Sequence, residues 1–147
     1  MNSPLKFRPS LMRCARMMSD EVNMLLLPHN LNYSLWQVLY VIQHRQGCTS
    51  IEIADYLNVS KPSIAKRIHS LMQLHVLQQV ETEDKRKKKL ILSQNGQQLY
   101  EDCSKLIDRF EQSLIQNFDS ELLNQSTHLL QQIIQQLEAS KSGGIHD

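Results

Sequence analysis

Two helix-start signals follow each other closely in the middle of the chain, and they constrain the fold more than any other feature. Thr49 and Glu52 form a capping box, in which the hydroxyl bonds the amide three residues on and the carboxylate reaches back. Asn58 suits the left-handed turn that ends a short helix. Ser60 then caps a second helix, with Pro62 in its first turn, where a missing amide donor costs little.

The apolar residues that follow each start signal recur at helical spacing, so each helix has one face to bury. The residues expected to face inward are Ile51, Ile53, Ala54 and Leu57 in the first helix, and Ile64, Ile68 and Leu71 in the second. Two short helices joined by a tight turn predict a helix-turn-helix.

A hairpin with a basic tip is predicted directly after this motif. Residues 76–80 and 90–92 are short apolar strand candidates. Between them lie five consecutive cations, which are Lys85, Arg86, Lys87, Lys88 and Lys89. Adjacent like charges cannot be buried in a core, so the tip must project into solvent or onto a polyanion.

The charge of the chain is unevenly distributed. The formal net charge of the 147 residues is only +1. Residues 60–90 hold eight Lys and Arg against three Asp and Glu, which is +5, so the remainder sums to −4. A basic centre between acidic ends indicates a local site for a polyanion such as DNA.

Helical stripes flank the central segment. Apolar residues three and four apart predict helices over residues 5–27, from a cap at Asn32 to Gly47, from a cap at Ser93 to Phe118, and from a cap at Asp119 onward. The outer stripes exceed what the core of a small monomer needs, so the terminal helices are expected to form a homodimer.

Several other classes of protein are disfavoured by the sequence. Three separated cysteines without a CxxC pair fit a reducing cytoplasm and argue against a disulfide framework or a zinc site. The histidines lack metal-ligand spacing, so no bound metal is expected. No nucleophile–base pair and no phosphate-binding loop stands out, so neither catalysis nor a cofactor is expected. The apolar run Met24–Leu27 is too short for a membrane span. A cytoplasmic protein without a membrane partner is therefore expected.

The element order resembles that of the MarR family of winged helix-turn-helix transcription regulators over nearly the whole chain. The residues that carry the resemblance are Asn30-Leu31-Asn32, Trp36-Gln37-Val38-Leu39, Ile53–Ser60, Asp84-Lys85-Arg86 and Leu90–Gly96. His75 departs from the pattern, because a glycine is common there. The resemblance implies a mainly α fold with a small β-hairpin wing.

The same resemblance implies how the chain is organised. Residues 1–140 form a single domain, in which 5–29 and 94–140 are dimerisation helices and 32–92 are the DNA-binding lobe. Residues 141–147 are small and polar, and are expected to be a disordered tail.

The second helix of the motif has the residue pattern of a DNA-reading helix. On a helical wheel, Pro62, Lys66 and His69 point away from the buried direction, with Ser63 beside them. Lys61 and Arg67 lie on the flanks, where longer cations reach phosphates, and the amides near Ser60 and Lys61 can meet a phosphate. The alternative is an ordinary solvated helix face.

Roles within the wing follow from the resemblance. Arg86 matches the arginine that enters the minor groove, and Asp84 matches the carboxylate that holds it. The remaining cations of the tip, including Lys87, Lys88 and Lys89, are expected to contact phosphates. The alternative is that these lysines only keep an edge hairpin in solution.

Tyr33, Trp36 and Tyr40 are candidates to line an effector pocket between the dimer helices and the DNA lobe. Cys14 is either a redox sensor or a packed core cysteine.

The predicted function is a homodimeric repressor that binds double-stranded DNA at a pseudo-palindromic operator and is released by a small molecule. The alternatives are a winged-helix module that binds protein, and a cysteine-based redox-sensing regulator.

Overall fold

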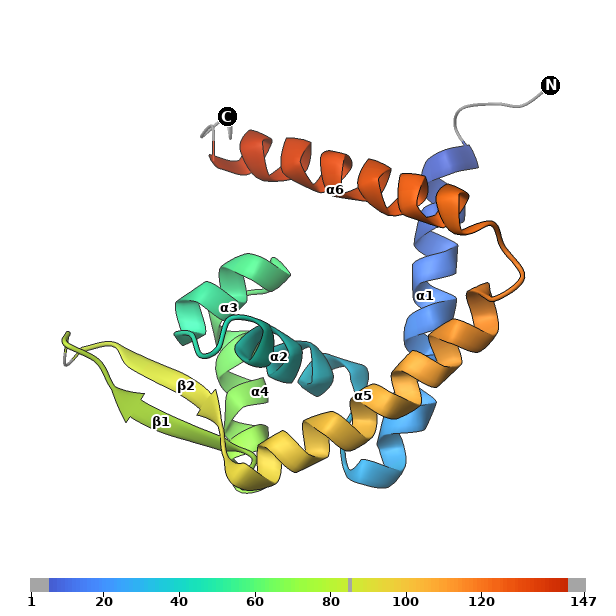
Figure 1. Cartoon of the computed structure of the whole chain (residues 1–147). Helices are drawn as coiled ribbons and strands as arrows, with labels where there is room; N and C mark the ends of the chain where they lie inside the picture. The colour runs from blue at the N-terminus through green and yellow to red at the C-terminus, as the bar shows by residue number, and fades with distance from the viewer. Residues whose placement is uncertain (1–5, 85, 143–147) are drawn as a thin grey trace. The chain divides into compact units, whose positions relative to one another are not determined.

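The computed structural model describes residues 6–84 and 86–142 (Figure 1). Its elements are α1 (Phe7–Leu26), the 3-10 turn η2 (Leu27–His29), α2 (Tyr33–His44), α3 (Ser50–Leu57), α4 (Lys61–Gln73), β1 (Leu77–Glu81), β2 (Lys88–Leu92), α5 (Gln94–Ile115) and α6 (Ser120–Ser142). This mainly helical fold with one two-stranded hairpin confirms the predicted fold class. The predictions for Lys85 and for residues 143–147 lie outside the described residues.

The predicted helix caps are present. The Thr49 hydroxyl accepts a hydrogen bond from the Glu52 amide at 3.3 Å, and the Glu52 carboxylate accepts one from the Thr49 amide at 2.9 Å. Asn58 closes α3 at φ 55°, and the Ser60 hydroxyl accepts from the Ser63 amide. These local bonds place α3 and α4 as a helix-turn-helix.

The helices α1, α2, α3, α4 and α5 and the hairpin share one hydrophobic core. Its fully buried large side chains include Leu26, Val38, Leu39, Val41, Ile42, Ile53, Ile64, Leu71 and Cys103. The expectation that Ile51 faces inward is wrong, because its side chain is 47% exposed. Ile51 occupies the first turn of α3, one position off the stripe that Ile53, Ala54 and Leu57 share.

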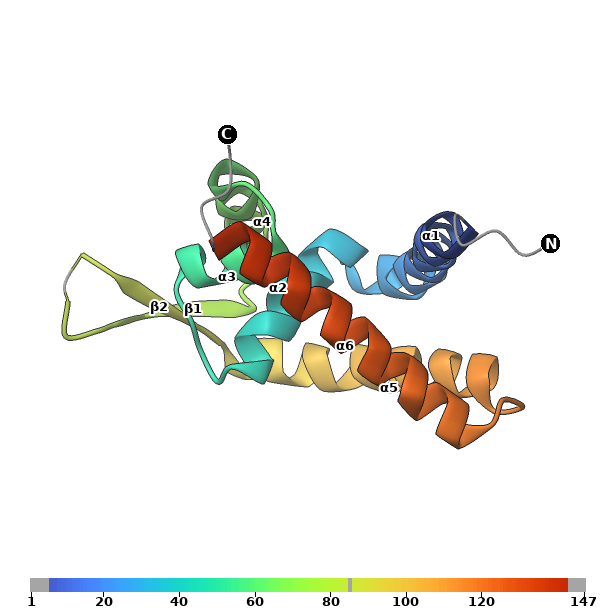
Figure 2. The same ribbon diagram turned by 90° about the horizontal axis from the view of Figure 1, so that it is seen from above.

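The hairpin pairs its strands antiparallel, with Leu77 opposite Leu92 and Glu81 opposite Lys88. Leu77, Leu90 and Leu92 are buried at the base. The chain before α3 also joins the sheet, because the Cys48 amide donates to the Leu90 carbonyl at 3.1 Å. Both views show the hairpin projecting away from α2, α3 and α4 (Figures 1 and 2).

The junction between the hairpin and α5 depends on a close backbone approach. Ser93 caps α5, since its hydroxyl accepts from the Gly96 amide at 3.0 Å and donates to the His75 carbonyl at 2.7 Å. A Cβ atom on Gly96 would lie 2.1 Å from the Val76 carbonyl oxygen, so only glycine fits. His75 has φ 60°, which is the left-handed conformation that a glycine adopts more easily.

The chain falls into two compact units, the first running to Phe110 and the second beginning at Glu111. α5 ends at Ile115, three residues before the predicted end. In the second unit, Asp119 caps α6 through the Leu122 amide at 3.1 Å. α6 continues to Ser142, so residues 141 and 142 are helical, where a disordered tail was expected. The division into dimerisation helices and a DNA-binding lobe stays a prediction.

Candidate DNA-binding interface

α4 has one buried and one exposed face, as the wheel predicted. Ile64, Ile68 and Leu71 are buried against the core. The exposed residues at its start and along its outer face are Ser60, Lys61, Pro62, Ser63, Lys66 and His69. The structure therefore leaves these six predicted site residues exposed at the start and along the outer face of one helix.

Arg67 differs from the other predicted residues of α4. Its side chain is half-buried, and its Nη1 donates to the Ser34 carbonyl and to Gln37 Oε1, both at 3.2 Å. These bonds tie α4 to the first turns of α2. A contact between Arg67 and a phosphate stays a prediction, and such a contact would have to compete with these bonds.

The wing tip holds Arg86 beside Asp84. Arg86 Nε lies 3.4 Å from Asp84 Oδ1, and the side chain of Arg86 is 91% exposed. The Arg86 amide donates to the same carboxylate oxygen at 3.0 Å. The Lys87 amide donates to the Asp84 carbonyl at 2.9 Å and closes the turn. The tip thus presents a guanidinium that its own turn keeps in place.

Sequence reasoning missed Thr82, which organises this turn. Its hydroxyl lies 2.7 Å from the Asp84 carbonyl oxygen and 2.8 Å from that of Lys87. A single hydroxyl so close to both carbonyls joins the two sides of the tip. Threonine next to a charged turn is a weak signal, because many turns carry one without such bonds.

The wing lysines are not equivalent. Lys87 and Lys88 are exposed, whereas Lys89 is half-buried opposite Val80 in the hairpin. Arg86, Lys87 and Lys88 also line a hollow with Thr49, Ser50, Ile51 and Glu52 at the start of α3. Hydrogen bonds from Thr49 lower the pKa of Glu52, with the positive charges of Arg45 and Lys87 acting in the same direction. The residues of the wing tip therefore face the start of α3 across this hollow.

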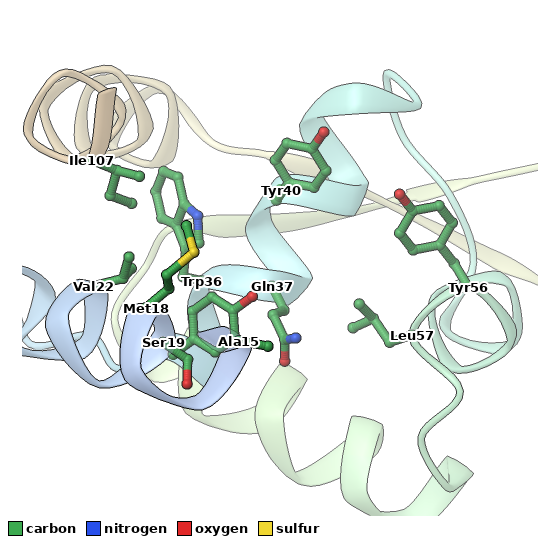
Figure 3. A pocket seen from close by; sticks show the side chains of 11 residues that line it. Ala15, Met18, Ser19, Val22, Trp36, Gln37, Tyr40, Tyr56, Leu57 and Ile107 are labelled. Carbon is green, nitrogen blue, oxygen red and sulfur yellow. The ribbon is translucent and has the colours of Figure 1, made fainter. Parts of the chain in front are cut away.

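A second site is an aromatic cavity of about 490 Å³ in the first unit (Figure 3). The three predicted pocket residues Tyr33, Trp36 and Tyr40 all line it. The other lining residues are Ala15, Met18, Ser19, Val22, Gln37, Tyr56, Leu57 and Ile107. Sequence reasoning missed Gln37, which follows Trp36 on α2, and Tyr56, which reaches the cavity from α3 through the packing of the two helices.

Ring contacts fix several walls of this cavity. Trp36 stacks on Tyr100 of α5 with ring centroids 4.8 Å apart, and Tyr40 stacks on His44 at 5.7 Å. The Asn23 side chain accepts from the Tyr33 amide at 2.9 Å and joins α1 to α2. The cavity is therefore built before any ligand binds.

The cysteines occupy different environments. Cys48 and Cys103 are buried, and burial raises the pKa of each thiol to about 11. Cys14 is exposed, so the expectation of a packed core cysteine is wrong for the single chain. α1 is covered mainly at its end, where Val22 and Leu26 are its buried residues. The Cys14 thiol lies 3.9 Å from the Met18 sulfur.

Within residues 6–84 and 86–142, no group of three or more His, Cys, Asp or Glu side chains is placed to hold a metal ion. Over the same residues, no helix is long and apolar enough to cross a bilayer.

Comparisons with known sequences agree with this geometry. A family model described as a winged helix DNA-binding domain matches residues 31–96. The uncharacterized HTH-type transcriptional regulator YwoH of Bacillus subtilis is 32% identical over 122 residues, which are 83% of this chain and 89% of the relative. HTH-type regulators of Staphylococcus aureus are 28% identical over 112 residues, which are 74% of this chain and 77% of the relative.

Solved structures share the fold. A Staphylococcus aureus MarR in complex with salicylate and kanamycin is 26% identical, with a TM-score of 0.81 over 90% of this chain and 91% of that chain. Staphylococcus aureus MepR in complex with DNA is 20% identical, with a TM-score of 0.77 over 89% and 97%. The exposed face of α4, the basic wing and these likenesses lead to one conclusion. The chain belongs to the MarR family of winged helix-turn-helix transcription regulators and is a DNA-binding protein.

Proposed function

We propose that the protein is a repressor that binds a pseudo-palindromic operator as a homodimer and is released by a small molecule. The observation that carries the DNA-binding part is the shared exposure of the α4 outer face and the wing tip. An exposed helix face and an exposed basic hairpin on the same lobe suit a major groove and a minor groove.

Each exposed residue has a role in this proposal. Lys66 and Ser63 read base edges in the major groove, with Pro62 and His69 beside them. The backbone amides near Ser60 and Lys61, at the start of the helix, meet a phosphate. Arg86 enters the minor groove, where a narrow A·T-rich segment has enhanced negative potential. The wing lysines, Lys85 included, contact phosphates, which add affinity without sequence information.

Homodimer formation is supported by unpartnered apolar side chains. In the second unit, Leu122, Leu129, Ile134 and Leu137 are each 46–64% exposed along α6. A helix in water with this many exposed large apolar side chains suits a partner surface. A two-fold dimer binds two half-sites about one helical turn apart, so the operator is expected to be pseudo-palindromic.

Release by a small molecule is supported by the aromatic cavity. Its volume of about 490 Å³ lies within the range of small-molecule sites. The Staphylococcus aureus MarR structure holds salicylate and kanamycin, and a Rhodococcus jostii CouR structure holds p-coumaroyl-CoA. In this proposal a ligand in the cavity favours a dimer geometry that no longer fits the operator.

The protein is proposed to act without catalysing a reaction and to work in the cytoplasm, where chromosomal DNA lies. One rival is a winged-helix module that binds a protein. Another rival is a redox regulator, and the exposed thiol of Cys14 is consistent with that function.

Selection of bound sequences from a random duplex library tests the proposal. The expected product is a pair of inverted half-sites about one helical turn apart, with A·T-rich positions under the wings. A library that returns no enriched sequence at low and moderate salt would contradict the regulator proposal and favour the protein-binding rival.

A further inference from the structure

One acidic side chain faces the cations of the wing. Glu52 lines the hollow of about 410 Å³ between the wing tip and the start of α3. The wing side chains that line the same hollow are Arg86, Lys87 and Lys88, and all three are exposed. Capping of α3 does not account for a negative charge at this place, because a neutral glutamine caps a helix in the same way.

Both carboxylate oxygens of Glu52 are held in position. Oε1 accepts a hydrogen bond from the Thr49 amide at 2.9 Å, and Oε2 lies 3.5 Å from Nη1 of Arg45, which ends α2. The side chain of Glu52 is nevertheless 49% exposed. The negative charge is therefore fixed at the start of α3 while half of the side chain stays accessible.

Lys87 is the wing cation that interacts with Glu52 across the hollow. Hydrogen bonds from Thr49 lower the pKa of Glu52 most, and the positive charges of Arg45 and Lys87 lower it further. The attraction between two opposite charges is mutual, so the fixed carboxylate also draws the flexible Lys87 ammonium towards α3.

A DNA phosphate has to compete with Glu52 for the Lys87 ammonium. Phosphate contacts supply affinity that does not depend on sequence, and each of them adds to the salt dependence of binding. An ammonium with a carboxylate nearby gains less from a phosphate than an ammonium without one. The charge of Glu52 should therefore weaken binding to every duplex by a similar factor.

We propose that Glu52 is an internal counter-ion of the wing, which competes with DNA phosphates for Lys87 and so limits sequence-independent binding. Glu52 acts through Lys87 and is a positioning residue rather than a contact to DNA. This inference rests on the proposed phosphate contacts of the wing lysines, and it names a residue that limits them.

Glu52→Gln tests this role, because glutamine keeps the size of the side chain and the capping bond but removes the charge. Fluorescence anisotropy on the full chain should give a severalfold lower Kd on the selected operator and on a random-sequence duplex, with the ratio of the two unchanged. The salt slope should become steeper by up to roughly 0.9 for each protomer. Unchanged or weaker binding overturns the proposal.

The double variant shows whether Glu52 acts through the wing. In a Lys87→Ala background, Glu52→Gln should lower Kd by a smaller factor, because the cation that the carboxylate attracts is gone. A gain that persists in full means that Glu52 repels phosphates directly or that the released Arg45 binds them, and it overturns the proposal.

Asp55→Asn is the matched control. It removes one negative charge from an exposed position of the same helix, outside the hollow. Its Kd on both duplexes should stay close to that of the wild type. A gain equal to that of Glu52→Gln would reflect only the net charge of the protein, and it overturns the proposal.

A titration without DNA provides a second measurement. NMR of the Glu52 carboxyl group in the wild type and in Lys87→Ala should show a higher pKa in the variant, because a positive charge that lowers the pKa is lost. An unaltered pKa overturns the interaction between the two residues, and the experiment needs no change at the cap of α3.

Lys87→Ala alone separates this inference from the proposed function. If this variant binds DNA as the wild type does, the proposed phosphate contact of Lys87 fails and the inference fails with it. If Lys87→Ala weakens binding while Glu52→Gln does not strengthen it, only the counter-ion role of Glu52 fails.

Discussion

One oxygen of Asp84 accepts two hydrogen bonds from Arg86. The Arg86 amide lies 3.0 Å from Asp84 Oδ1, and Arg86 Nε lies 3.4 Å from the same atom. An exposed ion pair contributes little to the stability of the fold, so the Asp84–Arg86 pair matters mainly for the position of the guanidinium. The backbone bond fixes the turn, and the side-chain bond limits where the guanidinium can go. The guanidinium is therefore held near Asp84 at the tip of the wing while its outer side stays open to solvent.

Loss of Arg86 should alter sequence preference. Arg86→Ala should weaken binding to A·T-flanked operators more than to G·C-flanked ones, because the guanidinium responds to groove width. The triple change of Lys87, Lys88 and Lys89 to Ala should instead weaken binding on every sequence. It should also reduce the salt slope by roughly 0.9 for each phosphate that a lysine no longer neutralises, doubled across a dimer. Fluorescence anisotropy at several salt concentrations measures both effects.

Asp84→Ala is the companion variant for the wing. It should partly reproduce the Arg86→Ala change in the A·T to G·C affinity ratio, since the guanidinium loses its partner. It also removes a negative charge near DNA, so only the ratio is informative. If the triple lysine variant changes this affinity ratio and Arg86→Ala leaves it unchanged, then the roles assigned to Arg86 and to the lysines are reversed.

Lys66 should contribute to discrimination between sequences. Lys66→Ala should weaken operator binding by roughly 1–3 kcal/mol and random-DNA binding by less, because base contacts carry the difference. Lys105→Ala, on the exposed face of α5, removes the same charge away from the interface and serves as the control. Equal losses on both DNAs for Lys66→Ala would assign this lysine to the phosphate backbone.

Dimerisation should depend on the apolar stripe of α6. Sedimentation at micromolar concentration should give about twice the chain mass of 17.1 kDa. Ile134 and Leu137 are 52% and 64% exposed, and changing both to Glu should shift the protein to monomer. Changing Gln135 and Gln136 to Glu adds the same charge to the same helix and should leave the dimer intact. A monomeric wild type would remove the basis for paired half-sites.

Gly96→Ala should destabilise the DNA-binding lobe. The new Cβ would meet the Val76 carbonyl oxygen at 2.1 Å, and backbone cannot yield as a flexible side chain can. A loss of about 1–3 kcal/mol in the free energy of unfolding is expected, as in other overpacked sites. Urea titration measures it, with Gln97→Ala on the exposed face of α5 as the control. A change within about 0.5 kcal/mol would show that the junction can open.

Alkaline pH should weaken the fold through the buried thiols. Burial raises the pKa of Cys48 and Cys103 from 9.0 to about 11, so the unfolded chain loses these protons first. Stability should hold below pH 9 and fall as pH rises from 9 to 11, by roughly 2–3 kcal/mol for each thiol. Urea midpoints under reducing conditions should show a shallower decline in Cys103→Ala. The matched variant Cys14→Ala, at an exposed thiol, should keep the wild-type decline.

Local signals in the sequence determined much of the fold. The capping box at Thr49 and the caps at Ser60 and Ser93 act over three or four residues, so their partners are neighbours in the chain. The basic tip could be placed because adjacent like charges exclude burial wherever the rest of the chain lies. The outer face of α4 followed from helical periodicity alone, which depends on no distant contact.

Tertiary structure decided where side chains meet across elements. The bonds from Arg67 to Ser34 and Gln37 join residues about thirty positions apart, and a helical wheel could only place Arg67 on a flank. Ile51 was assigned to the core from spacing, yet it is exposed, because burial requires a neighbouring element to cover the position. The cavity combines four helices, so its uncharged lining emerges only when they pack. Periodicity in sequence gives the direction of a side chain, whereas packing alone decides what it touches.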